Sequence, residues 1–215
     1  MLGKQEKRRR YATSPYALYG EKVPSAGEWR HRLGFPPQNP LLLEVGCGKG
    51  EFAVFLAERY PAALVIGLDR RADRLAAGCR LAQQKNLANV YFWHGDALTL
   101  ASAFNPGEVE AIWLNYPDPY PKARQAKHRL THPRFLWQYA YILQPEGKLH
   151  LRTDSEALFL FTLEQLEAQG WSILYANPAL PPDSGPPEAY FPTTFALRTG
   201  APIRYLEAAA PLRAR

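Results

Sequence analysis

The sequence has few cysteines and no long apolar run. Only Cys47 and Cys79 occur among its 215 residues, which excludes a disulfide-stapled scaffold and a cysteine-rich zinc module. These two cysteines have no histidine near them, so we expect no metal. No uninterrupted apolar stretch approaches the roughly 18 residues that a membrane-spanning helix needs. The charged stretch from Lys4 to Arg10 is followed by no hydrophobic segment, so we expect no secretory signal, no membrane partner and a cytoplasmic location.

What the sequence does contain favours a folded domain with an uneven charge. Hydrophobic residues make up 47% and aromatic residues 13% of the chain, which is enough to build a core at this length. Residues 1–40 hold eight Lys or Arg against three acids, residues 118–134 five against one, and residues 198–215 four against one. Such concentrations suit a polyanion, because phosphates neutralised by Lys or Arg release counterions. A solvated basic surface without a partner is the alternative that charge alone leaves open.

Short apolar runs alternate with helical periodicity from Leu41 onward, which is the pattern of an α/β sheet. Seven strands are expected, at residues 41–45, 64–68, 90–94, 111–114, 148–152, 171–175 and 203–206. The helices are expected at residues 52–59, 73–86, 135–143 and 155–169. We predict a basic N-terminal arm over residues 1–40 whose end packs on the body, a domain over residues 41–207 and a tail over residues 208–215. Within the domain, residues 177–198 form a Pro-rich loop.

A glycine-rich turn joins the first predicted strand to the first predicted helix, in the segment Glu44-Val-Gly46-Cys-Gly48-Lys-Gly50. Alternate glycines let a ligand approach the main chain closely. Asp69 ends the second strand, where an acid accepts hydrogen bonds from two ribose hydroxyls, and Asp96 ends the third strand beside the adenine position. Each acid taken alone also fits a helix cap or a surface charge.

Two features separate this loop from a dinucleotide site. The glycines are spaced G-x-G-x-G rather than G-x-G-x-x-G, and Glu44 stands just before them. A carboxylate at that place disfavours a pyrophosphate and favours a ligand with a cationic amino-acid end. S-adenosylmethionine carries an ammonium, a sulfonium and no phosphate. The segment and its acids resemble the Rossmann-like class I methyltransferases, which implies an α/β fold with a mostly parallel seven-stranded sheet and helices on both faces.

A stiff proline-rich segment follows the fourth predicted strand, Asn115-Tyr-Pro-Asp118-Pro-Tyr-Pro-Lys122. Ligands of α/β sheets bind at the carboxyl ends of the strands, so this segment is expected beside the cofactor. Three prolines within five positions hold the backbone extended, which fixes the direction of the Asp118 carboxylate. An aspartate that serves only the turn is the alternative. The cations that follow at Arg124, Lys127 and Arg129 favour a phosphate-binding surface instead.

The segment from Tyr116 to Lys122, with the cations after it, resembles the Phe-Pro-Asp-Pro-Trp-Pro-Lys signature of the bacterial tRNA (guanine-N7)-methyltransferases. Thr153-Asp154 and residues 193–198 resemble two further elements of that family, so the resemblance spans about residues 40–207. It implies a methyltransferase domain over residues 41–207 that methylates N7 of a guanosine in the tRNA variable loop, with S-adenosylmethionine as the donor. The implied cofactor-binding residues are Glu44, Gly46, Gly48, Gly50, Asp69, Asp96 and Asp118.

The same resemblance implies roles in substrate binding and catalysis. Asp118 falls on the catalytic position. The implied substrate-binding residues are Lys122, Asp154, Thr193, Thr194, Phe195 and Ala196, and the RNA backbone is expected at Arg124, Lys127 and Arg129. Guanine N7 has a free lone pair and carries no proton, so no base is needed, and Asp118 is expected to stabilise the positive charge that appears on the purine. Ala196 stands where the family has Glu, and Glu188 is a candidate replacement.

Other functions stay open at this point. The segment from Asn115 to Tyr120 also looks like the Asn/Asp-Pro-Pro-Tyr motif of amino-group nucleic-acid methyltransferases, although the inserted residues and the basic run argue against it. The missing Glu at Ala196 keeps a non-catalytic RNA-binding relative open. A nucleotide-dependent oxidoreductase is disfavoured by Glu44 and the glycine spacing. We expect a monomer, with a homodimer as the alternative.

Overall fold

The structure is a computed structural model that describes residues 3–181, 185–192 and 202–211. The strands are β1 (Ala17–Leu18), β2 (Leu41–Val45), β3 (Leu64–Asp69), β4 (Val90–His94), β5 (Val109–Asn115), β6 (Leu143–Thr153), β7 (Ser172–Asn177) and β8 (Arg204–Ala209). The α-helices are α1 (Lys4–Ala12), α2 (Trp29–Arg32), α3 (Glu51–Arg59), α4 (Ala72–Gln84), α5 (Leu100–Ala103), α6 (Pro133–Ile142), α7 (Glu156–Ala168) and α8 (Pro187–Tyr190). Three 3-10 helices complete the described elements: η1 (Gly20–Lys22), η2 (Ala97–Thr99) and η3 (Ala123–His128).

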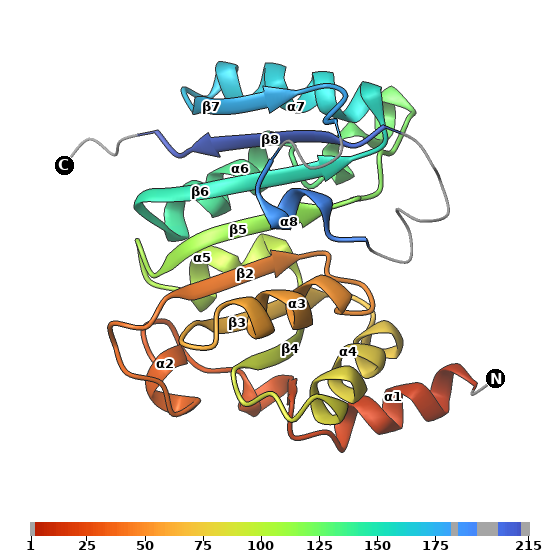
Figure 1. Ribbon diagram of the computed structural model, residues 1–215, viewed down its shortest axis with the longest axis vertical. Helices are drawn as coiled ribbons and strands as arrows, with labels where there is room; N and C mark the ends of the chain where they lie inside the picture. The colour runs from red at the N-terminus through yellow and green to blue at the C-terminus, as the bar shows by residue number, and fades with distance from the viewer. Residues whose placement is uncertain (1–2, 182–184, 193–201, 212–215) are drawn as a thin grey trace.

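One sheet runs through the molecule in the order β1-β4-β3-β2-β5-β6-β8-β7. Its neighbours pair in parallel except at β8, which is antiparallel to both β6 and β7. Figure 1 shows α3 and α4 in front of this sheet and α5 and α6 behind it. The strand order reverses beside β2, because β3 and β4 lie on one side of it and β5 and β6 on the other. In open α/β sheets such a switch point is where ligands bind.

The sheet forms because its central strands are apolar on both faces. Every residue of β2 is buried, with Leu41 and Leu43 packed into the core on the α5–α6–α7 side and Leu42 into the core on the α3–α4 side. Strands covered on both faces read as continuous apolar runs, as this one does. The predicted α/β fold with helices on both faces is confirmed.

The predicted number of strands is wrong by one. Across the described residues the sheet has eight strands rather than seven, and the additional strand is the two-residue β1, which pairs with β4. A strand of two residues is too short to show a period in the sequence. The N-terminal residues are expected from the sequence to form an arm whose end packs on the body. They pack along much of their length, since Tyr11, Leu18 and Trp29 are all buried. Within the described residues, no helix combines the length and apolar character needed to cross a membrane.

Candidate active site

A cavity of about 470 Å³ opens at the carboxyl ends of the parallel strands. Its volume lies in the range usual for small-molecule sites. The cavity wall includes Asp69 at the end of β3, Asp96 after β4 and Asp118 after β5. Three acids that the sequence singled out thus come together, because parallel strands end at the same edge of the sheet.

The glycine-rich turn between β2 and α3 bends sharply at three positions. Gly46, Gly48 and Gly50 have φ values of 78°, 56° and 72°, in the left-handed region that favours glycine. At Gly50, an added Cβ would also collide with the Phe92 ring. The N–H of Gly48 donates to Asp69 Oδ2 at 2.9 Å, which ties the turn to the end of β3. Of the three glycines, Gly46 lines the cavity.

Asp69 and Asp96 combine a place on the cavity wall with local backbone contacts. Besides Gly48, Asp69 accepts a hydrogen bond from the N–H of Arg71 at 2.8 Å. Asp96 caps η2 by accepting from the N–H of Leu98 at 3.0 Å, and it lies 3.5 Å from the exposed Arg70 guanidinium. Asp96 therefore serves as a cap, which is the alternative that the sequence left open, whereas Asp69 fixes the two turns beside it, and both acids still line the cavity. Their predicted contacts with a ribose and an adenine stay predictions.

Glu44 lies beneath the glycine turn rather than on the cavity wall. Its side chain is buried, and Oε1 accepts a hydrogen bond from Asn115 Nδ2 at 2.9 Å. The other oxygen, Oε2, is buried without a hydrogen-bond partner among the described residues. Burial raises the pKa of Glu44 to about 7, although the Asn115 hydrogen bond and the nearby Arg152 charge oppose the rise. A buried carboxyl whose pKa is raised by burial is a fitting partner for a cationic group, which stabilises its charged form.

A buried arginine, which the sequence analysis did not identify, supports this acid. Arg152 at the end of β6 is fully buried, and its Nε donates to Asn115 Oδ1 at 2.7 Å. Its Nη1 donates to the carbonyl oxygen of Phe191 at 2.9 Å. A chain of contacts thus leads from Glu44 through Asn115 and Arg152 to the segment just before Thr193. The available signal was a cation that ends a predicted strand directly after Leu151, since buried Arg is rare unless it is paired.

The proline-rich segment is strained on both sides of Asp118. Tyr116 has a φ of 48° and Tyr120 a φ of 43°, in a region that bulky residues rarely adopt and that concentrates at functional sites. The N–H of Tyr116 donates to the carbonyl oxygen of Arg152 at 2.8 Å, which anchors the start of the segment to β6. Asp118 itself is exposed and lines the cavity.

Arg129 has an inward contact that the sequence did not predict. Its Nη2 donates to the carbonyl oxygen of Tyr120 and its Nε to that of Pro119, both at 3.1 Å. The guanidinium also lies over the Phe161 ring, 4.3 Å from its centroid. Arg129 thus holds the end of the proline-rich segment. Its predicted contact with an RNA backbone stays a prediction.

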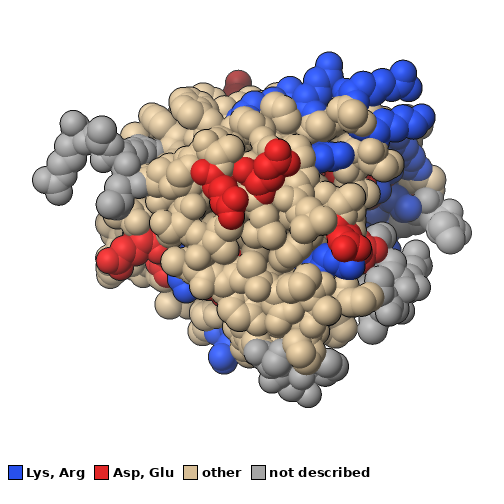
Figure 2. Space-filling view, turned by 90° about the horizontal axis from the view of Figure 1, so that it is seen from above, with Lys and Arg blue, Asp and Glu red and all other residues tan. Residues whose placement is uncertain are grey.

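The remaining predicted substrate residues fall into three groups. Lys122, Arg124 and Lys127 are exposed on and beside η3. Asp154 follows β6 and is half-buried. Thr193, Thr194, Phe195 and Ala196 lie outside the described residues. In the view of Figure 2, Lys and Arg gather along one edge of the molecule while Asp and Glu form small separate groups.

Glu188, the candidate replacement for the missing family Glu, is placed elsewhere. It is buried in α8, and its Oε1 accepts a hydrogen bond from the Tyr60 hydroxyl at 2.5 Å. It does not line the cavity. Within the described part of the chain, no three His, Cys, Asp or Glu residues form a group that could hold a metal ion. Cys47 and Cys79 are both buried free thiols.

The fold and the cleft at the strand ends define a class I methyltransferase, and solved structures agree. The 16S rRNA methyltransferase KamB superposes with a TM-score of 0.67 at 16% identity, covering 90% of this chain and 99% of KamB. The 16S rRNA (adenine(1408)-N(1))-methyltransferase from Catenulisporales acidiphilia gives a TM-score of 0.59 at 17% identity, covering 100% of this chain and 96% of that one. At these identities the likeness concerns the fold alone.

Sequence comparisons narrow the class to a family. A family model described as "Putative methyltransferase" matches residues 38–189. The tRNA (guanine-N(7)-)-methyltransferase of Christiangramia forsetii is 36% identical over 186 residues, covering 84% of this chain and 82% of that protein. The enzyme of the same name from Levilactobacillus brevis is 38% identical over 153 residues, covering 71% and 70%. The chain belongs to the tRNA (guanine-N7)-methyltransferase family, as its Pro-Asp-Pro segment predicts.

Proposed function

We propose that this protein transfers a methyl group from S-adenosylmethionine to N7 of a guanosine in the variable loop of tRNA, in the cytoplasm. The observation that carries the proposal is the position of Asp118, on the wall of the strand-end cavity between two strained tyrosines. The family to which the chain belongs supports the reaction, since its relatives are named for guanine N7 of tRNA. The variable-loop position rests on the resemblance of the segment from Tyr116 to Lys122 to the family signature.

The residues around the cavity fit S-adenosylmethionine. Behind the cavity wall, beneath the glycine turn, the buried Oε2 of Glu44 has no hydrogen-bond partner among the described residues and suits a cationic amino-acid end. Asp69 and Asp96 line a cavity large enough for a nucleoside, and their carboxylates can accept hydrogen bonds from its hydroxyl and amino groups. When bound, this donor supplies an electrophilic methyl group.

The work of the protein is then alignment and charge stabilisation. Guanine N7 needs no base, because its lone pair is free, so the rate depends on how the chain holds the purine and the charge that develops on it. Asp118 accepts hydrogen bonds from the guanine edge and stabilises the cationic ring. Lys122 and Asp154 hold and orient the nucleoside, which must leave its stack to reach the cavity. Arg124 and Lys127, which are exposed, contact phosphates.

Transfer of labelled methyl groups to an unmodified tRNA transcript tests the proposal. Mass spectrometry of the digested nucleosides should give 7-methylguanosine, and strand cleavage at the modified base should place it in the variable loop. Asp118→Asn should lower kcat by roughly 100-fold or more, as loss of one charge-stabilising group does. Glu110→Gln is the matched control, since Glu110 is an exposed acid at the opposite end of β5.

Three results would contradict the proposal. Methylation of an exocyclic amino group would assign the chain to another kind of nucleic-acid methyltransferase. Donor and tRNA binding without transfer would make it a non-catalytic relative. Near-normal turnover of Asp118→Asn would remove the role given to that carboxylate.

A further inference from the structure

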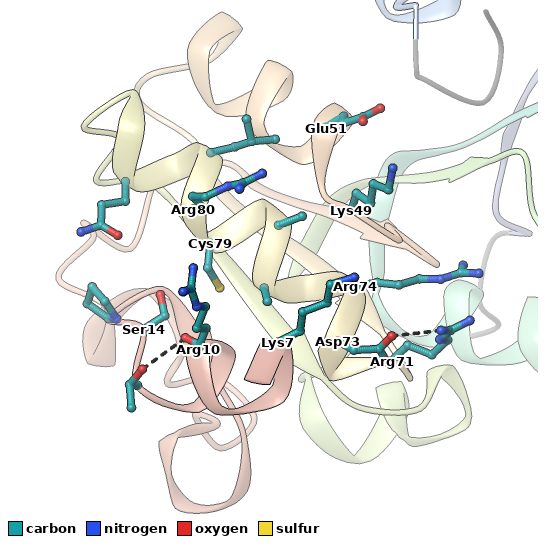
Figure 3. A pocket seen from close by; sticks show the side chains of 16 residues that line it. Lys7, Arg10, Ser14, Lys49, Glu51, Arg71, Asp73, Arg74, Cys79 and Arg80 are labelled. Carbon is teal, nitrogen blue, oxygen red and sulfur yellow. Dashed lines mark hydrogen bonds and ion pairs between the residues drawn. The ribbon is translucent and has the colours of Figure 1, made fainter. Parts of the chain in front are cut away.

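A second hollow, separate from the strand-end cavity over most of its extent, lies between α1 and α4. Its volume is about 790 Å³, and its lining includes the cations Lys7, Arg10, Lys49, Arg71, Arg74 and Arg80 against the two acids Glu51 and Asp73. Figure 3 shows Lys7 and Arg10 reaching from α1 and Arg74 and Arg80 from α4. We call this hollow the α1–α4 groove. Its lining carries a clear excess of positive charge.

Most of these cations form no ion pair with the described residues of the protein. Lys7, Lys49, Arg74 and Arg80 make no ion pair with any of the described residues, whereas Arg71 pairs with Asp73 at 3.0 Å and Arg10 with Glu6 at 2.9 Å. Unpaired cations close together repel one another, so their collection in one groove is unfavourable for the protein alone. A polyanionic ligand would reverse that cost.

The helix that forms one wall contacts the body of the protein through one buried residue and a hydrogen bond from the Tyr19 hydroxyl to the carbonyl oxygen of Ala12 at 2.9 Å. Tyr11 is the one buried residue of α1, and its hydroxyl lies 2.7 Å from the Leu18 carbonyl oxygen and 2.9 Å from that of Phe92. The same hydroxyl accepts a hydrogen bond from the N–H of His94 at 3.0 Å. A nine-residue helix is not stable by itself in water, so tertiary contacts such as this anchor to β4 place the cations of α1 opposite α4.

The groove is continuous with the proposed active site. Arg71 and Arg74 line both the α1–α4 groove and the strand-end cavity. A chain of phosphates that lies in the groove would therefore lead toward the cavity where the base is placed.

We propose that the α1–α4 groove binds the phosphodiester backbone of the tRNA, in addition to the cations that follow Asp118. The inference rests on the proposed function, which supplies the polyanion. Phosphate contacts of this kind position a nucleic acid without reading its sequence. The groove extends the RNA contact from the base-binding end of the sheet across α4 to α1.

The salt dependence of tRNA binding tests the groove. Lys7→Gln/Arg80→Gln removes two unpaired cations that do not line the strand-end cavity. Each lost phosphate contact lowers the slope of log K against log salt by about 1, so the double variant should lower it by about 2. At about 0.15 M salt this corresponds to a roughly 10- to 30-fold weaker affinity for tRNA. The affinity for S-adenosylmethionine and kcat at saturating tRNA should not change.

Arg8→Gln/Arg32→Gln is the matched control. Both residues are exposed cations that do not line the groove, and Arg8 lies on α1 beside Lys7. The control should keep the salt slope of the unaltered protein. Lysine labelling gives a second measurement: bound tRNA should protect Lys7 and Lys49 from an amine-reactive reagent but not Lys85, which pairs with Glu58 outside the groove.

The outcomes separate the groove from the proposed function. If the double variant and the control have the same salt slope, or if Lys7 stays fully reactive under bound tRNA, the groove proposal is wrong while methyl transfer can still be intact. A double variant that keeps its tRNA affinity but loses binding to anionic phospholipid vesicles would also overturn it, in favour of a membrane surface. Absence of methyl transfer by the unaltered protein would refute the proposed function, and the binding data would still decide whether the groove holds RNA.

Discussion

Replacing Arg152 with methionine tests whether the buried contacts behind the cavity support the active site or only the fold. The guanidinium donates to Asn115 Oδ1 at 2.7 Å and to the Phe191 carbonyl oxygen at 2.9 Å. Methionine keeps much of the apolar stem but leaves both acceptors without a donor. Each acceptor left unpaired costs about 1–3 kcal/mol, so the free energy of unfolding should fall by about 2–6 kcal/mol.

The same substitution should weaken donor binding, although Arg152 is placed outside the cavity wall. Asn115 loses the contact that orients its amide toward Glu44, and Glu44 loses a nearby positive charge that lowers its pKa. Loss of one hydrogen bond to a charged group is worth about 1.5 kcal/mol, so the Kd for S-adenosylmethionine should rise roughly 10-fold. Arg152→Lys, which keeps the charge and one donor, should recover part of both effects.

Arg30→Met is the control that separates a loss of protein stability from a loss of donor binding caused by misplaced site residues. Arg30 also donates to two carbonyl oxygens, those of Asn39 at 2.6 Å and Glu108 at 3.0 Å, and it does not line the cavity. Urea unfolding should show comparable losses for Arg30→Met and Arg152→Met, whereas calorimetry should show weaker donor binding only for Arg152→Met. Equal donor affinities in the two variants would refute the positioning role of Arg152.

Two further predictions concern pH. Burial raises the pKa of Glu44 to about 7 in the protein without donor, and a cationic ligand favours the carboxylate, so donor binding should release a proton near neutral pH and tighten as the pH rises toward 7. Calorimetry in buffers of different ionisation enthalpy measures that proton, and Glu44→Gln should abolish its release. Burial lowers the pKa of His150 from 6.5 to about 4, although the Glu207 carboxylate 3.8 Å away opposes the shift. Since the unfolded chain binds a proton first, His150 should lower the free energy of unfolding by about 3 kcal/mol as the pH falls from about 6.5 to about 4. Urea unfolding at several pH values measures this loss, and His150→Gln should make the free energy of unfolding depend less on pH in that range. An unchanged pH dependence in His150→Gln would contradict the role given to His150.

The glycine turn and the central strands could be predicted because each follows from a local pattern. The apolar run of β2 ends at a turn whose glycines all have positive φ, and the acids after the next strands mark the same edge of the sheet. The contacts behind the cavity could not be predicted in this way. Glu44 and Asn115 are 71 positions apart, and Asn115 and Arg152 are 37 apart, so only the fold brings them together. The placement of α1 likewise depends on Tyr11 reaching the backbone of β4.

The cations after Asp118 serve different purposes, although in the sequence they look alike. Residues held at positive φ store about 1–3 kcal/mol each, and such strain persists only when surrounding contacts enforce it. At the start of the segment that contact is the hydrogen bond from Tyr116 to the backbone of β6, and at its end it is the pair of hydrogen bonds from Arg129. Arg129 therefore supports the direction of Asp118 from within the protein. Arg124 and Lys127 stay exposed for a phosphate, so the proline-rich segment joins a fixed carboxylate to a free cationic surface within a few residues.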